Sequence, residues 1–231
     1  MPAYHEDPSQ FPMDGGCACG LIRYRISQAP IIVHCCHCTS CQRETGTAFA
    51  LNAFIESTSV EQLAPSKPMV PAGPTKDFPA VPALPEITTP FVDPATLAPA
   101  SEDIPLRYAV IKRPEGAPSP QYIVLPSQSK KGQTVARCPR CYTCLWSHYG
   151  GGSGPAITVI RVGTLDEAWK VGPDVHIFTR SKRDFVKLDD GVKQFPAFYR
   201  SRKGVYREDA QERFAKLIPE IRAYHATMSK L

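Results

Sequence analysis

Alternating hydrophobic and polar positions predict a β-strand near the start of the chain. Ile22, Tyr24 and Ile26 alternate with Arg23 and Arg25, which is the period of a strand that buries one face. The strand follows directly after the first two cysteines. We therefore expect a cysteine-bearing turn that leads into a half-buried strand.

Short β-branched and apolar runs predict further strands, separated by turns that contain glycine, proline or charged residues. These runs cover residues 31–33, 48–55, 106–111, 121–125, 134–137, 156–162, 175–178 and 185–188. The run at 156–162 gives the clearest pattern. A mainly β fold is the prediction.

One helix is predicted, at the C-terminal end, over residues 208–231. Apolar side chains recur there at helical spacing, at Phe214, Leu217, Ile218, Ile221 and Tyr224. Asp209 is the expected N-cap, and Pro219 inside the pattern predicts a kink or a break.

The segment at residues 64–126 differs from the rest of the chain because it holds 15 of the 24 prolines. Proline lacks a backbone donor and fixes φ, so the segment cannot form a run of central strands. We interpret it as an insertion, partly of polyproline II type, within a single domain spanning residues 1–231. A surface loop without a role and a lid or partner-facing segment are both compatible with this composition.

Composition is that of an ordinary globular protein, with 231 residues, 42% hydrophobic and 21% charged. No run of 18 apolar residues is present, which argues against a membrane-spanning helix. The first residues lack the basic start and apolar core of a secretory signal, so we expect a cytoplasmic protein. In a reducing compartment the nine cysteines are better explained by metal binding or catalysis than by disulfides.

The net charge of +5 is concentrated in the last quarter of the chain. Residues 180–231 hold 13 Lys/Arg against 7 Asp/Glu. A solvated basic surface, an anionic small substrate and nucleic acid would each be compatible with this excess. No recognisable nucleic-acid module is present, so a small-molecule substrate is preferred over nucleic acid. The sequence does not indicate an oligomeric state.

The densest chemistry lies at residues 34–43, where four cysteines and two histidines occur within eight positions. Cys36, Cys38 and Cys41 supply three thiolates, which is the composition of a zinc site with one open position. His34 or His37 could close this site and make it structural. Cys35 could replace Cys36, but adjacent side chains of an extended segment point apart, so the two do not bind together. A nucleophilic cysteine with a histidine base is a further alternative.

Two other cysteine pairs lie far apart in the sequence, at Cys17 and Cys19 and at Cys138 and Cys141. Neither pair can complete a tetrahedral zinc site alone. Together they provide four thiolates, which predicts a structural zinc that joins the start of the fold to its middle. Buried free thiols are the alternative.

These motifs together resemble the glutathione-dependent formaldehyde-activating enzyme family, which also includes centromere protein V. The resemblance rests on Gly16-Cys17-Ala18-Cys19-Gly20, on His34 to Arg43 with Gly46, on Cys138-Pro139-Arg140-Cys141, and on Val162-Gly163-Thr164-Leu165-Asp166. It implies a zinc-stapled, mostly antiparallel β fold of the β-tent type. It also implies a structural zinc at Cys17, Cys19, Cys138 and Cys141 and a catalytic zinc at Cys36, Cys38 and Cys41. Tyr142 departs from the family, which usually has glycine after the last cysteine pair.

The resemblance implies a zinc-dependent carbon–sulfur lyase that reversibly adds the glutathione thiol to formaldehyde or a related aldehyde. Two zinc ions and glutathione as co-substrate are therefore expected. Three thiolates leave the catalytic zinc with a net negative charge, so we expect Arg43 to compensate it. Two alternatives remain: the same site acting on a larger electrophile of a biosynthetic pathway, and a non-catalytic scaffold in which both zinc ions are structural.

Overall fold

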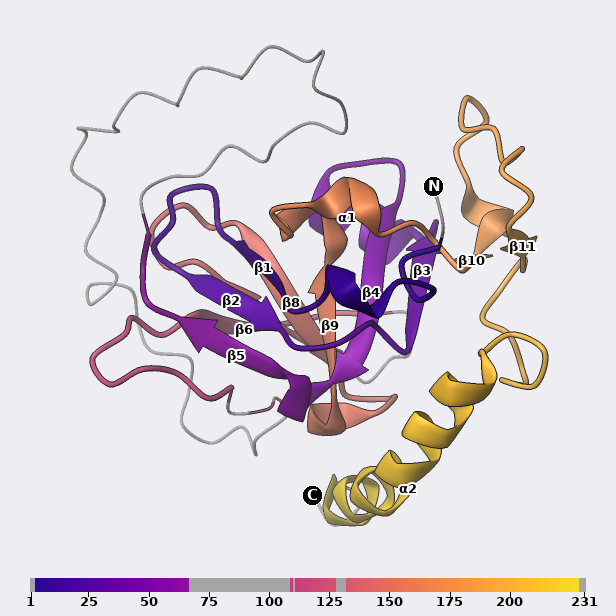
Figure 1. Cartoon of the computed structure of the whole chain (residues 1–231). Helices are drawn as coiled ribbons and strands as arrows, with labels where there is room; N and C mark the ends of the chain where they lie inside the picture. Colours follow the sequence, from indigo (N-terminus) through magenta and orange to yellow (C-terminus); the bar gives the residue numbers. More distant parts are fainter. Residues whose placement is uncertain (1–2, 67–108, 110, 128–131, 229–231) are drawn as a thin grey trace.

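The computed structural model describes residues 3–66, 109, 111–127 and 132–228 (Figure 1). Most of the predicted insertion at 64–126 and most of the predicted strand at 106–111 lie outside these residues. Within the described ranges, no helix combines the length and apolar character needed to cross a membrane.

The fold is mainly β with a C-terminal helix, as the sequence predicts. The strands are β1 (Met13–Gly16), β2 (Arg23–Ile26), β3 (Ile32–Cys36), β4 (Ala50–Glu56), β5 (Val60–Leu63), β6 (Gln121–Leu125), β7 (Gln133–Arg137), β8 (Cys144–Tyr149), β9 (Ile157–Arg161), β10 (Val175–Ile177) and β11 (Lys193–Gln194). The α-helices are α1 (Thr39–Thr45) and α2 (Glu208–Met228), and short 3-10 turns include η4 (Gly154–Ala156) and η7 (Thr179–Ser181).

The strands form two sheets. The small sheet has the order β1-β2-β5, and the large sheet has the order β11-β10-β3-β4-β9-β8-β7-β6. Nearly all pairs are antiparallel, in agreement with the prediction, but β10 pairs in parallel with both β3 and β11. Parallel neighbours require a long connection. Here the chain between β3 and β10 contains the strands β4 to β9.

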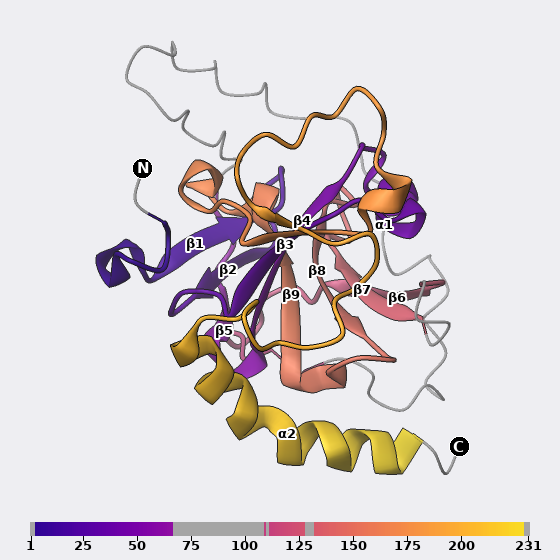
Figure 2. The same cartoon turned by 90° about the vertical axis from the view of Figure 1, so that its right-hand side faces the viewer.

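The large sheet is covered on both faces. One face packs against the small sheet, where the rings of Tyr24 on β2 and Trp146 on β8 meet edge to face with centroids 5.7 Å apart. The other face packs against α2, through a cluster that includes Phe214 of the helix and Ile157 and Val159 of β9. Figure 1 shows the small sheet in front of the large one, and Figure 2 shows α2 lying across the lower part of the molecule. The metal-binding candidates lie on both sides of this layer.

Helix α2 is continuous through Pro219, and Figure 2 shows its axis change direction part-way along its length. The expected kink is thus present without a break. Asp209 lies inside the first turn, because the helix begins one residue earlier, so its assignment as N-cap is wrong. Its carboxylate accepts a hydrogen bond from the Arg207 guanidinium at 3.1 Å and lies near the positive end of the helix dipole.

Several other sequence expectations need correction. Residues 185–188 form no strand, and Phe185 is 74% exposed, so the apolar run there does not mark a buried face. Strand β3 continues into the cysteine cluster instead of ending before it. Helix α1 and strand β8 were not predicted; α1 is short and lacks an apolar stripe, and β8 carries buried polar residues such as His148.

Strand β5 is joined to the chain that follows the undescribed residues. The backbone amide of Gln62 donates to the carbonyl of Lys112 at 2.7 Å, and its side-chain amide donates to the carbonyl of Pro118 at 2.6 Å. Glu61 and Lys112 also form a parallel bridge. The point where the chain leaves the small sheet therefore lies next to the point where it returns.

Candidate active site and metal centres

Cys36, Cys38 and Cys41 form a three-cysteine cluster at the end of β3 and the start of α1. Their Sγ atoms lie within 4.8 Å of one another, and all three residues are buried. The period of β3 places Cys36 on the α2 side of the large sheet. Cys38 is the N-cap of α1, and its sulfur accepts from the Cys41 amide at 3.4 Å. Strand end and helix start therefore direct three thiols to one point.

The cluster favours negative charge on one sulfur. Hydrogen bonds from the Cys36 and Cys41 thiols hold the pKa of Cys38 well below its usual range, and the same bond to Cys38 is the first cause that raises the pKa of Cys36. A lone cysteine as buried as these would instead remain a neutral thiol. Three convergent sulfurs of this kind suit zinc, which prefers deprotonated thiolates as ligands.

A buried chain of hydrogen bonds connects the three-cysteine cluster to β4, β9 and α1. The side-chain amide of Asn52 on β4 lies 3.9 Å from the Cys41 sulfur and is its donor. The Asn52 oxygen accepts from the guanidinium of Arg161, which is directly opposite it on β9. Arg161 also pairs with Glu44 of α1 at 2.5 Å. The guanidinium of Arg161 is thereby held close to the cysteines, with Asn52 between it and Cys41.

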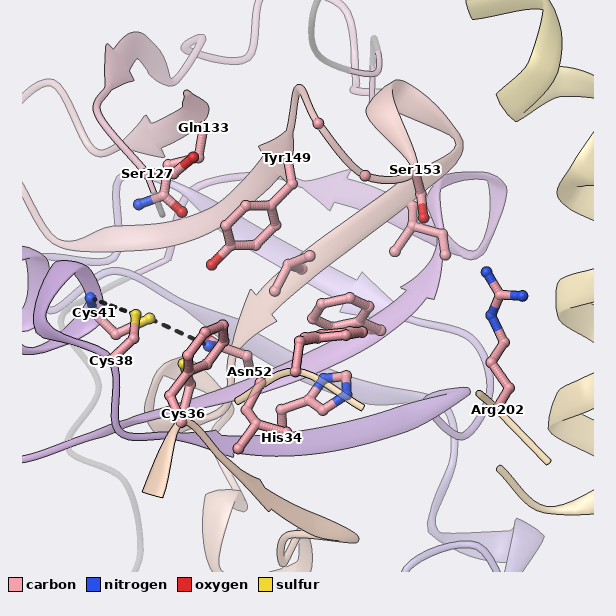
Figure 3. Close-up of a pocket in the computed structure, with 18 of the residues that line it drawn as sticks. His34, Cys36, Cys38, Cys41, Asn52, Ser127, Gln133, Tyr149, Ser153 and Arg202 are labelled. Carbon is pink, nitrogen blue, oxygen red and sulfur yellow. Dashed lines mark hydrogen bonds between the residues drawn. The ribbon is translucent and has the colours of Figure 1, made fainter. Parts of the chain in front are cut away.

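The cluster opens into a cavity of about 870 Å³ between the large sheet and α2 (Figure 3). Most of the wall is apolar or aromatic, and three arginines line it at Arg180, Arg202 and Arg222. A volume and lining of this kind match the pockets that bind small molecules. Part of the wall comes from α2 and the segment just before it.

Tyr149 and His34 are two of the polar side chains that line this cavity. Figure 3 shows the hydroxyl of Tyr149 on the side of the cavity toward the cysteines. Burial, followed by the charge of Cys41, raises the pKa of Tyr149 well above its usual value, so the phenol keeps its proton. Burial lowers the pKa of His34 to about 3, and its Nε2 lies 2.8 Å from the Tyr199 hydroxyl. His34 is thus a neutral residue of the cavity wall, and its ring nitrogens are not in the group of convergent ligand atoms that the three cysteines form.

Cys17, Cys19, Cys138 and Cys141 form a four-cysteine cluster on the opposite side of the large sheet, and their ligand atoms also lie within 4.8 Å of one another. The Cys17–Cys19 and Cys19–Cys138 sulfur pairs are 3.5 and 3.7 Å apart. Tetrahedral zinc with zinc–sulfur bonds of about 2.3 Å needs sulfurs about 3.8 Å apart. Backbone amides also donate to these sulfurs, for example Ile22 to Cys17 at 3.3 Å. The donor set therefore fits a closed zinc site.

A comparison with protein families identifies this arrangement. A family model described as glutathione-dependent formaldehyde-activating enzyme matches residues 12–72 and 117–181. The chain belongs to this family, abbreviated GFA below. A search of curated proteins gave no match. The two matched ranges contain all nine cysteines, whereas α2 and the segment before it lie outside them.

Tyr142 lies directly after the last cysteine pair, at the position where the GFA family usually has glycine. Tyr142 adopts a left-handed backbone with φ of 57°, and its amide donates to the Cys138 carbonyl at 3.0 Å. The glycine-type turn is therefore kept, at a cost of about 1–2 kcal/mol for a residue with a Cβ. The departure does not disturb the cysteine pair.

Arg43 does not occupy the place that charge compensation in a GFA site would require. Its side chain is exposed on α1 and does not line the cavity. Arg161, only 5% exposed, lies beneath the cysteines instead. The sequence did not single out Arg161, Asn52 or Tyr149, because their relation to the cysteines depends on strand register and not on a local motif.

Cys35 and His37 also lie apart from the three-cysteine cluster. The strand period directs Cys35 to the face opposite Cys36, as expected for neighbours in an extended segment. Cys35 and His37 meet His176 of β10, which the GFA motifs quoted above do not include, and the three form a group of their own. Neither Cys35 nor His37 therefore closes the three-cysteine site.

Proposed function

We propose that this chain is a zinc-dependent carbon–sulfur lyase of the GFA type, which reversibly adds the thiol of glutathione to formaldehyde or a related aldehyde. The observation that carries the proposal is the three-cysteine cluster at the inner end of a cavity, with no fourth protein ligand from the described residues in its group. A closed structural site fills all four positions from protein, whereas catalytic sites keep one open.

Cys36, Cys38 and Cys41 would hold the catalytic zinc, and the four-cysteine cluster would hold a structural one. When bound at the open site, zinc supplies Lewis acidity toward a thiolate or a carbonyl oxygen. Asn52 orients the Cys41 sulfur, and Arg161 offsets part of the negative charge of three thiolates. Both are positioning residues in this scheme, and Arg161 takes the compensating role that the sequence suggests for Arg43.

In the addition, the S–H bond of the thiol breaks and a C–S bond forms at the carbonyl carbon. The carbonyl oxygen takes up a proton and becomes a hydroxyl group, so nothing is oxidised or reduced. We propose that Tyr149 donates this proton and recovers one from the incoming thiol. Its raised pKa keeps it protonated in the resting enzyme, and a donor aimed at a developing oxyanion lowers the barrier.

Tyr149→Phe is expected to lower kcat by about a hundredfold, the lower range for general acid catalysis. Zinc content should stay at the wild-type value, because the phenol is not a ligand. Tyr206→Phe is the matched control: it lines the same cavity, but its hydroxyl is bonded to Tyr199 at 3.2 Å. Steady-state kinetics on both variants test the assignment, and equal kcat values for Tyr149→Phe and wild type would reject it.

The three arginines of the cavity support an anionic thiol substrate, such as the dicarboxylate glutathione. Arg202 is the best placed of them for a side-chain test, since its guanidinium lies 3.8 Å from the centre of the Phe214 ring and so remains ordered at the wall. The basic excess of the last quarter of the chain then acts as an anion-binding wall.

Arg202→Gln is expected to raise the KM for glutathione about tenfold, which corresponds to the loss of one charge-assisted contact of about 1.4 kcal/mol. The KM for an uncharged thiol such as 2-mercaptoethanol should not change. Arg200→Gln, an exposed position outside the cavity, is the control. A parallel rise of both KM values would show that the substitution acts on the fold of the wall and not on the anion.

The size of the cavity favours a second candidate, in which the same site acts on a larger electrophile. Its aromatic wall includes Phe178, Phe198 and Phe214, and the last two belong to the part of the chain beyond the GFA match.

Because α2 completes the wall, we propose that residues 1–231 act as one domain.

Incubation of the zinc-loaded protein with glutathione and carbon-13 formaldehyde separates these candidates. Accelerated exchange of the S-hydroxymethyl carbon, followed by NMR, would support the GFA reaction. A normal zinc content without acceleration would favour the larger electrophile. If removal of the ion from the three-cysteine cluster also unfolds the chain, the scaffold alternative gains instead, since an open catalytic site should lose its metal with the fold intact.

A further inference from the structure

Cys35, His37 and His176 form a third convergent group, which the proposed function does not use. Cys35 and His176 are direct partners on the parallel strands β3 and β10, and His37 follows the end of β3. All three are buried, with exposures of 3%, 0% and 3% in that order. None of them lines the cavity. The group therefore belongs to the sheet face opposite the three-cysteine cluster.

The distances within this group match a tetrahedral metal site. The Cys35 sulfur lies 3.5 Å from Nε2 of His37, and this same nitrogen lies 3.1 Å from Nδ1 of His176. Zinc bonds of about 2.3 Å to sulfur and about 2.0–2.1 Å to nitrogen at tetrahedral angles require about 3.5 Å and about 3.3 Å.

The group does not have the geometry of a proton relay. A relay through His37 would use its two ring nitrogens on opposite sides, as in a catalytic triad. Here Cys35 and His176 both approach Nε2, while Nδ1 of His37 is buried and has no hydrogen-bond partner among the described residues. Three atoms that converge on one point are the arrangement of metal ligands.

Asp190 completes the pattern expected around a metal-bound histidine. Its carboxylate accepts from Nε2 of His176 at 2.8 Å, which leaves Nδ1 as the free ligand atom. The other Asp190 oxygen accepts from the Val192 amide at 3.1 Å and is thereby fixed. Such carboxylate–histidine pairs orient metal ligands and set their tautomer. One thiolate and one carboxylate also balance the two charges of a zinc ion, as a buried site requires.

We propose that Cys35, His37 and His176 bind a third zinc ion, with Asp190 as the positioning residue for His176. The ion would tie the short strand β10 to β3 across a parallel pair that has only three register partners. Its role would be structural, since the group does not face the cavity. The proposal does not depend on the catalytic assignment above.

Zinc content of the purified full chain tests the proposal. After exhaustive dialysis, native mass spectrometry and elemental analysis should give three zinc ions for wild type and two for both Cys35→Ala and His176→Ala. Cys144→Ala removes a cysteine outside the three groups and should keep three. A zinc count in His176→Ala equal to that of wild type would overturn the proposal, whatever the occupancy of the other two groups.

Asp190→Asn gives a decision even if the ligand variants fail to fold, because the Asp190 side chain is 43% exposed. One of the three ions should then be lost to a competing chelator about 10–100 times more readily, the usual effect of removing a partner of a ligating histidine. Asp189→Asn, at the neighbouring exposed carboxylate, is the matched control. Identical chelator titrations for Asp190→Asn and wild type would contradict the assignment.

Discussion

Cys138→Ser is expected to leave the protein largely unfolded. Cys138 is fully buried and lies 3.7 Å from Cys19, so its loss opens the four-cysteine cluster that joins β2 to β7. A structural zinc contributes about 10–16 kcal/mol of apparent binding free energy, which is as large as the whole stability of a typical domain of about 5–15 kcal/mol. Far-UV circular dichroism and zinc content of the purified variant measure the effect.

Cys144→Ser provides the control for this experiment, because Cys144 is a cysteine of the same region that belongs to none of the three groups. It should retain the wild-type spectrum and zinc content. A folded Cys138→Ser protein with an unchanged unfolding midpoint in denaturant would show that the four cysteines are buried thiols without a structural ion, the alternative left open by the sequence.

Cys38→Ser is expected to abolish turnover while the fold is retained. Loss of the proposed catalytic ion would remove several kcal/mol of transition-state stabilisation, so kcat should fall about a thousandfold or more. Serine is also a good N-cap, so the start of α1 should persist without the sulfur. Activity, circular dichroism and zinc content measured on one preparation test all three statements.

The expected Cys38→Ser protein has one zinc ion fewer than wild type and an unchanged spectrum. Full activity with one ion missing would place the chemistry elsewhere. An unfolded variant would instead assign the three-cysteine cluster a structural role and favour the scaffold alternative. The comparison with Cys138→Ser is informative, because only one of the two clusters is expected to hold the fold together.

The sequence predicted both cysteine clusters because zinc ligands obey simple counting. Pairs that cannot complete a site alone must combine, and the structure brings Cys17 and Cys19 together with Cys138 and Cys141. Strand positions could be predicted from β-branched and alternating runs, because the two-residue period of a strand is visible within a few residues of sequence. The run at residues 185–188 shows the limit of this rule, because an apolar run predicts a strand only where a sheet offers it a partner.

The supporting residues of the site could not be predicted in this way. Arg161 reaches Asn52 only because β9 pairs with β4 in one register, and His176 reaches Cys35 only because β10 lies parallel to β3. Register and strand order are set by long-range packing, which a single sequence does not reveal. The arginine that we propose for charge compensation is therefore placed by sheet topology and not by a local motif.

The contacts of Gln62 with Lys112 and Pro118 affect the energetic cost of the inserted residues between them. They join the two ends of an excursion from the small sheet. The entropy lost on closing a flexible loop grows only with the logarithm of its length, by about 0.6 kcal/mol for each doubling. Because hydrogen bonds hold Gln62 beside Lys112 and Pro118, the number of residues between these positions is expected to have little effect on the free energy of unfolding.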